Sequence, residues 1–259
     1  MKALALLSFC LLLTVCSCHD FVKKPADKKP TVQAFNNKKN SSIDTSGKNL
    51  IPVFGYRFAI TGDFNGDGKK EKLTEHFISR IDNCESDKFY EGLKDYNQLV
   101  ELTMRKKPIS LVTCDDKSIH SLLITSHRNL GLAYLKNEGD LNGDGTDEVS
   151  YVIDWTDWSN LNSWNIVTYK NGKWKDLYSF PIWDWQLPDL PQTYNQYGPV
   201  GLENKIINTE NTKANKEIED SLNSFKGLIK KISNNKIQII YDNKEGVLDT
   251  GIVRLKTIN

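Results

Sequence analysis

The feature that most constrains this chain is a nine-residue loop that occurs twice. The first loop runs from Asp63 to Glu71 and reads DFNGDGKKE, and the second loop runs from Asp140 to Glu148 and reads DLNGDGTDE. In both copies, positions 1, 3, 5 and 9 carry carboxylate or amide oxygens, and glycine occupies positions 4 and 6. Glycine adopts positive φ angles without strain, so a tight loop can direct these oxygens at one point. The repeat therefore indicates two turns suited to a hard cation, which takes roughly six to eight oxygens.

The predicted ligands follow from their positions in each loop. We expect the side chains at positions 1, 3 and 5, the backbone carbonyl at position 7 and the carboxylate at position 9 to coordinate Ca²⁺. Metal-free turns also use Asn, Asp and Gly, but two copies with identical spacing favour calcium. We expect two sites with a structural role, because extracellular modules meet millimolar calcium. The predicted ligands are Asp63, Asn65, Asp67, Lys69 and Glu71 in the first loop, and Asp140, Asn142, Asp144, Thr146 and Glu148 in the second.

The residues after each loop distinguish it from an EF-hand. An EF-hand has a bidentate glutamate at position 12 and a helix on either side, whereas position 12 is Thr74 in one copy and Tyr151 in the other. The residues that follow alternate at a period of two, which is typical of strands. A metal loop between strands resembles the FG-GAP/VCBS repeat of integrin-like β-propellers and of many secreted bacterial proteins. The resemblance covers residues near 54–78 and 131–155, and it implies calcium binding at both loops.

Alternating apolar residues elsewhere predict a mainly β fold. The clearest hairpin joins Trp164–Tyr169 to Trp174–Phe180 through Asn171-Gly172, a favoured pair for a type I′ turn. Other predicted strands are Leu99–Met104, Ile109–Cys114 and Ile119–Thr125, followed by a short helix over 213–223 and a C-terminal β segment over 225–257.

The number of loops limits the architecture of this β body, which we expect to span residues 51–259. A propeller takes at least about four blades, and only two loops are present. We therefore expect antiparallel hairpins with little helix, arranged either like a propeller or as a compact β fold.

The N-terminal residues resemble a bacterial lipoprotein signal. Met1-Lys2 precedes an apolar run that ends in Val15-Cys16-Ser17-Cys18. This run is short for a membrane span, which takes roughly 20 apolar residues, and it has the charged start and short apolar region of a secretory signal. The resemblance implies a signal peptide over 1–17 and lipidation of Cys18. Residues 18–50 are rich in Lys, Asn, Ser and Pro, so we expect a disordered tether.

Two cysteines fall in the predicted β body. Export would place Cys84 and Cys114 in a compartment that permits disulfides. A bridge between them would contribute about 3–4 kcal/mol. Two separate buried thiols are the alternative, and the sequence does not decide between them.

An aromatic cluster offers a candidate ligand face. Trp155, Trp158, Trp183 and Trp185 fall in predicted loops with Asp154, Asp157 and Asp184. Exposed aromatic rings can stack on sugars, although Trp more often fills a core. The same carboxylates make an extracellular polysaccharide hydrolase the alternative function. No nucleophile, phosphate-binding or zinc motif supports catalysis, so the chain is more consistent with a binding protein than with an enzyme.

Together these features predict a lipid-anchored, exported calcium-binding protein. We expect it to act as a binding or structural module of the cell envelope, on the periplasmic or cell-surface side of a bacterial membrane. Its partners would be the membrane, through the anchor, and a glycan or an envelope protein. A formal net charge of +1 over 259 residues gives no sign of nucleic-acid binding.

Overall fold

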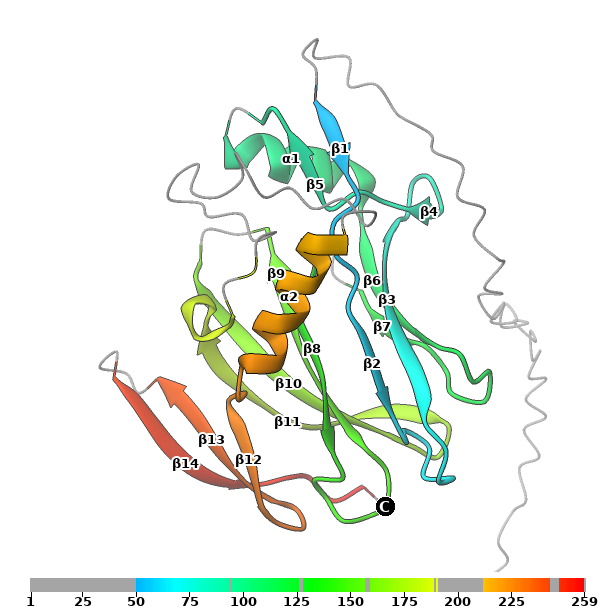
Figure 1. Ribbon diagram of the computed structural model, residues 1–259, viewed down its shortest axis with the longest axis vertical. Coiled ribbons are helices and arrows are strands. Elements are labelled where there is room, and N and C mark those ends of the chain that lie inside the picture. The colour runs from blue at the N-terminus through cyan, green and yellow to red at the C-terminus, as the bar shows by residue number, and fades with distance from the viewer. Residues whose placement is uncertain are drawn as a thin grey trace, which may run out of the picture. The chain divides into compact units, whose positions relative to one another are not determined.

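The structure is a computed structural model. It describes residues 50–93, 95–125, 128–156, 159–188, 190, 212–242 and 247–258. The predicted signal peptide, Cys18 and the predicted tether up to residue 49 lie outside the described residues. The described elements are mainly antiparallel strands with two α-helices, which confirms the predicted fold class and fits its compact alternative (Figure 1).

The first sheet contains the first loop. Its order is β2-β3-β6-β7, with β4 paired to the end of β3, and the first loop connects β2 to β3. All its pairings are antiparallel. Its strands are β2 (Ala59–Gly62), β3 (Glu71–Ser79), β4 (Cys84–Glu85), β6 (Ile109–Cys114) and β7 (Leu122–Ile124).

The second sheet contains the second loop in the equivalent place. Four consecutive strands pair in chain order, and the second loop connects the first two. The β10–β11 hairpin turns through Asn171 and Gly172, whose φ angles of 54° and 72° fit the predicted type I′ turn. The strands are β8 (Asn129–Gly139), β9 (Glu148–Trp155), β10 (Leu161–Lys170) and β11 (Lys173–Trp183).

The third sheet consists of three antiparallel strands in chain order. They are β12 (Ile229–Ser233), β13 (Lys236–Asp242) and β14 (Leu248–Arg254). The turn between β12 and β13 is short and places Asn235 at a φ of 60°. This hairpin therefore lacks an equivalent of the nine-residue loops.

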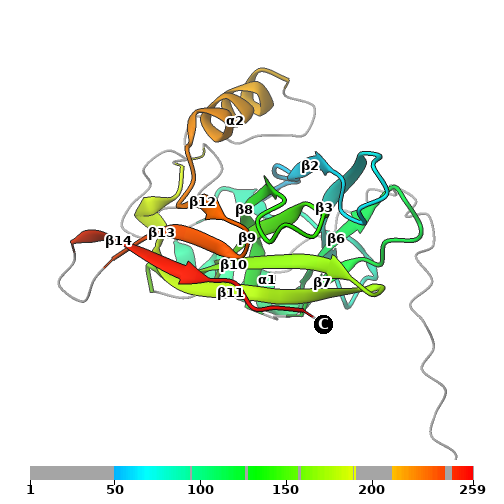
Figure 2. The same ribbon diagram turned by 90° about the horizontal axis from the view of Figure 1, so that it is seen from below.

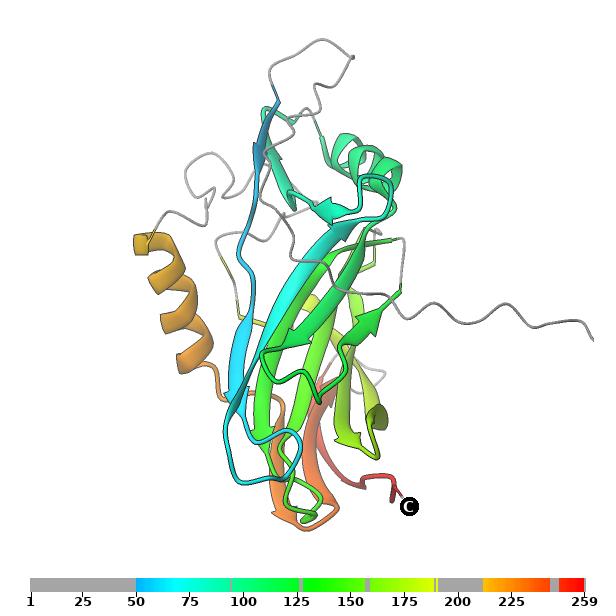
Figure 3. The same cartoon turned by 90° about the vertical axis from the view of Figure 1, so that its right-hand side faces the viewer.

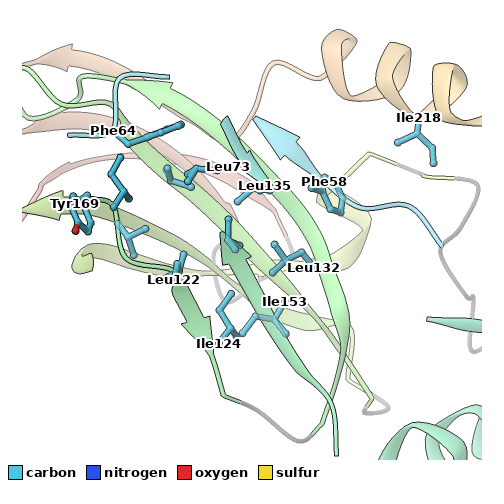
Figure 4. Close-up of a cluster of buried hydrophobic side chains, with 14 of the residues drawn as sticks. Phe58, Phe64, Leu73, Leu122, Ile124, Leu132, Leu135, Ile153, Tyr169 and Ile218 are labelled. Atoms are coloured by element: carbon cyan, nitrogen blue, oxygen red, sulfur yellow. The ribbon is translucent and has the colours of Figure 1, made fainter. Parts of the chain in front are cut away.

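The second sheet is buried on both faces. One face packs with the first sheet around residues such as Leu73, Leu132 and Val149, and Figure 4 shows the side chains of this core pointing toward one another. The other face, which includes Trp164, packs with the third sheet around Ile237 and neighbouring residues. Successive residues of β10 point to opposite faces, so Ile166 lies in one core and Val167 in the other. The register shift opposite them leaves Leu177 as an extra residue in β11.

Smaller elements flank these sheets. A two-stranded sheet of β1 (Ile51–Val53) and β5 (Phe89–Glu91) lies near helix α1 (Tyr96–Lys106), and a single 3₁₀ turn, η1 (Asp184–Gln186), follows β11. Helix α2 (Thr212–Ser224) buries Ile218 in the core between the first and second sheets, and Figure 4 shows this side chain. Neither described helix is long and apolar enough to cross a membrane.

The predicted strand over Leu99–Met104 is wrong, because these residues lie in α1. The Asp95 side chain accepts a hydrogen bond from the backbone N–H of Gln98 and caps the helix. Leu99 and Thr103, which are four residues apart, are buried on one helical face. The predicted helix over 213–223 is confirmed as α2.

Candidate metal centre

The first loop is shaped by hydrogen bonds to the carboxylate at position 1. Asp63 Oδ1 accepts from the backbone N–H of Gly66 at 2.8 Å and of Asp67 at 3.1 Å, while Oδ2 accepts from Gly68 at 2.8 Å. Gly66 and Gly68 have φ angles of 76° and 83°, a region that side chains make unfavourable. The two glycines thus let the backbone wrap around the Asp63 carboxylate.

Three carboxylates converge in the first loop. One oxygen of each of Asp63, Asp67 and Glu71 lies within 4.8 Å of the others. Among the residues that the structure describes, this is the one such acidic group identified. Glu71 is buried at the start of β3, and its Oε2 accepts from the backbone N–H of Phe64 at 2.9 Å. These oxygens can hold a metal ion, as the loop motif predicts.

The electrostatics of the first loop also favour a cation. Burial raises the pKa of Glu71 above its ordinary value, and the negative charges of Asp63, Asp67 and Asp116 raise it further. Such crowding of like charges makes ionisation unfavourable unless a cation compensates it. A hard cation would bind to oxygens that already repel one another.

The second loop repeats the hydrogen bonds of the first. Asp140 Oδ1 accepts from Gly143 at 2.5 Å, and Oδ2 accepts from Gly145 at 3.2 Å. At position 3, Asn142 Oδ1 accepts from the N–H of Asp144 at 2.7 Å, as Asn65 does from Asp67 at 2.9 Å. The two loops therefore share a local structure as well as a sequence.

The glutamate at position 9 differs between the loops. Glu148 is fully buried, and its Oε2 accepts from the backbone N–H of Leu141 at 2.6 Å and of Asn142 at 3.1 Å. Its Oε1 accepts from Asn142 Nδ2 at 2.8 Å. Burial raises the pKa of Glu148 to about 7. Both oxygens of this carboxylate are thus engaged within the loop itself.

The two loops are in direct contact. The backbone N–H of Asp147 donates to the Asp63 carbonyl at 2.7 Å, and the N–H of Asp63 donates to Asp147 Oδ2 at 3.0 Å. The same oxygen accepts from Asn137 Nδ2 at 2.8 Å. On the other side of the second loop, the N–H of Asn235 in the β12–β13 turn donates to the Leu141 carbonyl at 3.1 Å. Figures 2 and 3 show the three turns together at one end of the sheets.

The predicted aromatic ligand face is only partly described. Trp155 and Trp183 are half-buried, Trp185 is 58% exposed, and Trp158 lies outside the described residues. Of the accompanying carboxylates, Asp184 is exposed and its Oδ1 accepts from Asn162 Nδ2 at 3.0 Å. The described residues give no observation that gathers these groups around one ligand position.

The disulfide between Cys84 and Cys114 does not form in the structure, where both thiols are free. Strand pairing explains the separation. Cys84 lies opposite Ser79 at one end of β3, whereas Cys114 lies opposite Leu73 six residues away. At roughly 3.3 Å per residue, these positions are about 20 Å apart. The structure contains two separate thiols, but both are half-buried and not fully buried as the alternative supposed.

Sequence reasoning missed the groups that contact the second loop from other elements. Lys170 Nζ donates to Asp144 Oδ2 at 2.9 Å, and Lys231 on β12 donates to the Asp140 carbonyl. Thr168 Oγ1 lies 3.2 Å from the Thr146 hydroxyl. These contacts depend on how strands far apart in sequence pair and pack, and no local motif predicts them.

Comparison with known proteins gives no relative: no family, no curated protein and no solved structure matches the chain.

Proposed function

We propose that this chain is a lipid-anchored, exported protein whose two FG-GAP/VCBS-like loops bind Ca²⁺ and stabilise a β body. The body would act as a binding or structural module of the bacterial cell envelope. The observation that carries the proposal is the convergence of the Asp63, Asp67 and Glu71 carboxylates within 4.8 Å. All these ligand atoms are oxygens, which suits a hard cation such as Ca²⁺ better than a softer metal.

Three features support calcium binding in a structural role. The oxygens lie on a turn whose backbone is already folded by its own hydrogen bonds, so binding requires little ordering. Burial, and then the charges of neighbouring carboxylates, raise the pKa of Glu71, and a bound ion would stabilise its ionised form against both. The loops also contact each other through Asp63 and Asp147, so an ion in the first loop would strengthen the contact between the first two sheets.

Thermal unfolding of the full chain with and without calcium tests this proposal. At a free Ca²⁺ concentration about 100 times Kd, one site adds about 2.7 kcal/mol. For a body of this size each kcal/mol shifts the Tm by roughly 2–4 °C, so we expect EDTA to lower the Tm by about 5–10 °C. Added Ca²⁺ should restore it.

A pair of variants connects this effect to the first loop. Asp67→Asn removes a ligand charge, whereas Asp220→Asn removes an exposed charge on α2 and serves as the control. We expect Asp67→Asn to reduce the calcium-dependent shift and the control to retain it. A wild-type chain whose Tm is the same in EDTA and in excess Ca²⁺ would contradict the proposal.

The anchor and the partner require separate experiments. Changing Cys18 to Ala should release the chain from the membrane fraction of an expressing bacterium, because it removes the predicted lipidation site. Continued membrane retention would exclude Cys18 as the anchor. Screening the full chain against glycans and envelope proteins, with Ca²⁺ and with EDTA, would identify the partner class and show whether binding needs the metal.

A further inference from the structure

A lysine of the chain forms an ion pair with one carboxylate of the second loop. Lys170 is the last residue of β10, and its Nζ lies 2.9 Å from Asp144 Oδ2. The two side chains are only 33% and 27% exposed. Asp144 occupies position 5 of the loop, so the ammonium is bound to one of the proposed calcium ligands.

The first loop lacks an equivalent cation on its neighbouring strand. Among the described residues, the ion pair found at a carboxylate of this loop is that of Lys69, which is 82% exposed and 3.5 Å from Asp67 Oδ2. Because Lys69 is in the loop and its side chain is in solvent, it can move away at little cost. On the side away from β2, the strand that pairs with β3 is β6, and the residues after β6 are Asp115 and Asp116. Asp116 adds negative charge to the first loop.

Lys170 has less freedom to move away. Its backbone pairs with Lys173 in the β10–β11 hairpin, so the strand fixes the position from which the side chain extends. A second ammonium, that of Lys231, donates to the carbonyl of Asp140 at position 1. Two positive side chains from separate strands therefore contact the second loop. A divalent cation binding there must displace the Lys170 ammonium from Asp144 or bind beside it, and either change is unfavourable.

We infer that Lys170 is an intrinsic competitor of Ca²⁺ at the second loop, which makes this loop the weaker of the two calcium sites. The inference rests on the proposed calcium binding. It states the order in which the two loops bind Ca²⁺ as its concentration rises. The first loop, with three converging carboxylates and no comparable lysine, fills at low calcium. The second loop fills only when Ca²⁺ competes with the Lys170 ammonium, so this residue sets the ratio of the two affinities.

Calcium titration of the full chain by calorimetry tests the inference. The Asp67→Asn background weakens the first loop, so the remaining binding reports mainly on the second. In that background we expect Lys170→Met, which keeps an apolar stem but removes the charge, to raise calcium affinity by about tenfold. Lys170→Arg keeps the charge and should leave the affinity low. Lys173→Met is the matched control, because Lys173 is exposed and lies opposite Lys170 in the hairpin.

The outcomes separate this inference from the function on which it rests. A wild-type chain that binds no calcium overturns the proposed function. Two wild-type sites of equal affinity, or equal affinities for the Lys170→Met and Lys173→Met chains, overturn the role of Lys170 and leave calcium binding intact. If Lys170→Met does not fold, Lys170→Gln replaces it in the same comparison. A tenfold rise with Met or Gln and none with Arg supports the inference.

Discussion

The buried ion pair between Lys88 and Glu75 gives the sharpest test of how the first two sheets are joined. Lys88 Nζ lies 2.7 Å from Glu75 Oε1, and the side chains are 1% and 0% exposed. Glu75 also accepts backbone hydrogen bonds from Leu132 on β8 at 2.8 Å and from Phe58 at 3.1 Å. One carboxylate on β3 thus bonds to both the second sheet and the segment before β2.

Other residues surround the Lys88 side chain, which is almost completely buried. A Cβ added at Gly131 would lie 2.3 Å from Lys88 Cε, and the Phe58 ring lies on another side of the ammonium, 5.7 Å away. Burial lowers the pKa of Lys88, and the charge of Glu75 opposes this shift. Removing the carboxylate would therefore leave a buried ammonium without its counter-ion.

We expect Glu75→Gln to lower the free energy of unfolding by about 3–5 kcal/mol, the range for breaking a buried ion pair. Lys88→Met should have a smaller effect, because the remaining carboxylate keeps its two backbone N–H donors. In the double variant no unpaired ammonium remains, so the two changes should be less than additive by about 2 kcal/mol. Urea unfolding of the four chains measures all these values. A coupling energy below about 0.5 kcal/mol would show that the pair does not act as a unit.

Three further predictions concern other parts of the body. Gly172→Val should lower the free energy of unfolding by about 1 kcal/mol in urea, because Gly172 has a φ of 72° in the β10–β11 turn; an unchanged value would show that the turn tolerates a side chain. Ser150→Ala should lower the free energy of unfolding by about 1–3 kcal/mol, because the fully buried Trp164 indole donates to the Ser150 hydroxyl at 2.9 Å. Ser163→Ala, at an exposed position, is the control, and a smaller loss in Ser150→Ala than in this control would contradict the prediction. Although burial acts to raise the pKa of Glu85, the hydrogen bond with His76 and the charge of Arg57 hold that pKa below its ordinary value. The free energy of unfolding of the wild-type chain should therefore decrease as the pH falls from about 5 through the lowered pKa. Urea unfolding at a series of pH values should show a smaller decrease for Glu85→Gln. The same decrease in both chains would refute the role of Glu85.

The parts of the fold that the sequence predicts are those with local causes. Asn171-Gly172 specifies its turn through two positive φ angles. Burial alternates along most of β3 because one face of this strand meets a core, whereas β9 is buried on both faces and does not alternate in this way. The helix α1 was missed because its apolar residues also fit a short strand, and its cap at Asp95 lies outside that window. Strand β8 shows a nearly continuous buried run, since the second sheet is covered on both faces.

In the candidate site too, features with local causes are predictable from the sequence, whereas features set by sheet packing are not. The turn of each loop follows from its own Asp, Asn and Gly residues, so the convergence of Asp63, Asp67 and Glu71 is predictable. The contact of Asp147 with Asp63 and that of Lys170 with Asp144 are set by sheet packing and strand pairing. The separation of Cys84 from Cys114 likewise depends on the register of β3 with its neighbours.

The position of the second sheet between two others has a consequence for the order in which the chain can mature. Among the described elements, the third sheet comes last in sequence, and a ribosome delivers it after the first two. Until β12 to β14 are available, the face that carries Trp164, Leu177 and Ile182 lacks the residues of the third sheet that pack on it, such as Ile237 and Ile239. A nascent chain that stalls before residue 229 would expose a large apolar surface and become a target for chaperones or aggregation. The third sheet, which is made last, therefore removes an apolar face of the second sheet from solvent.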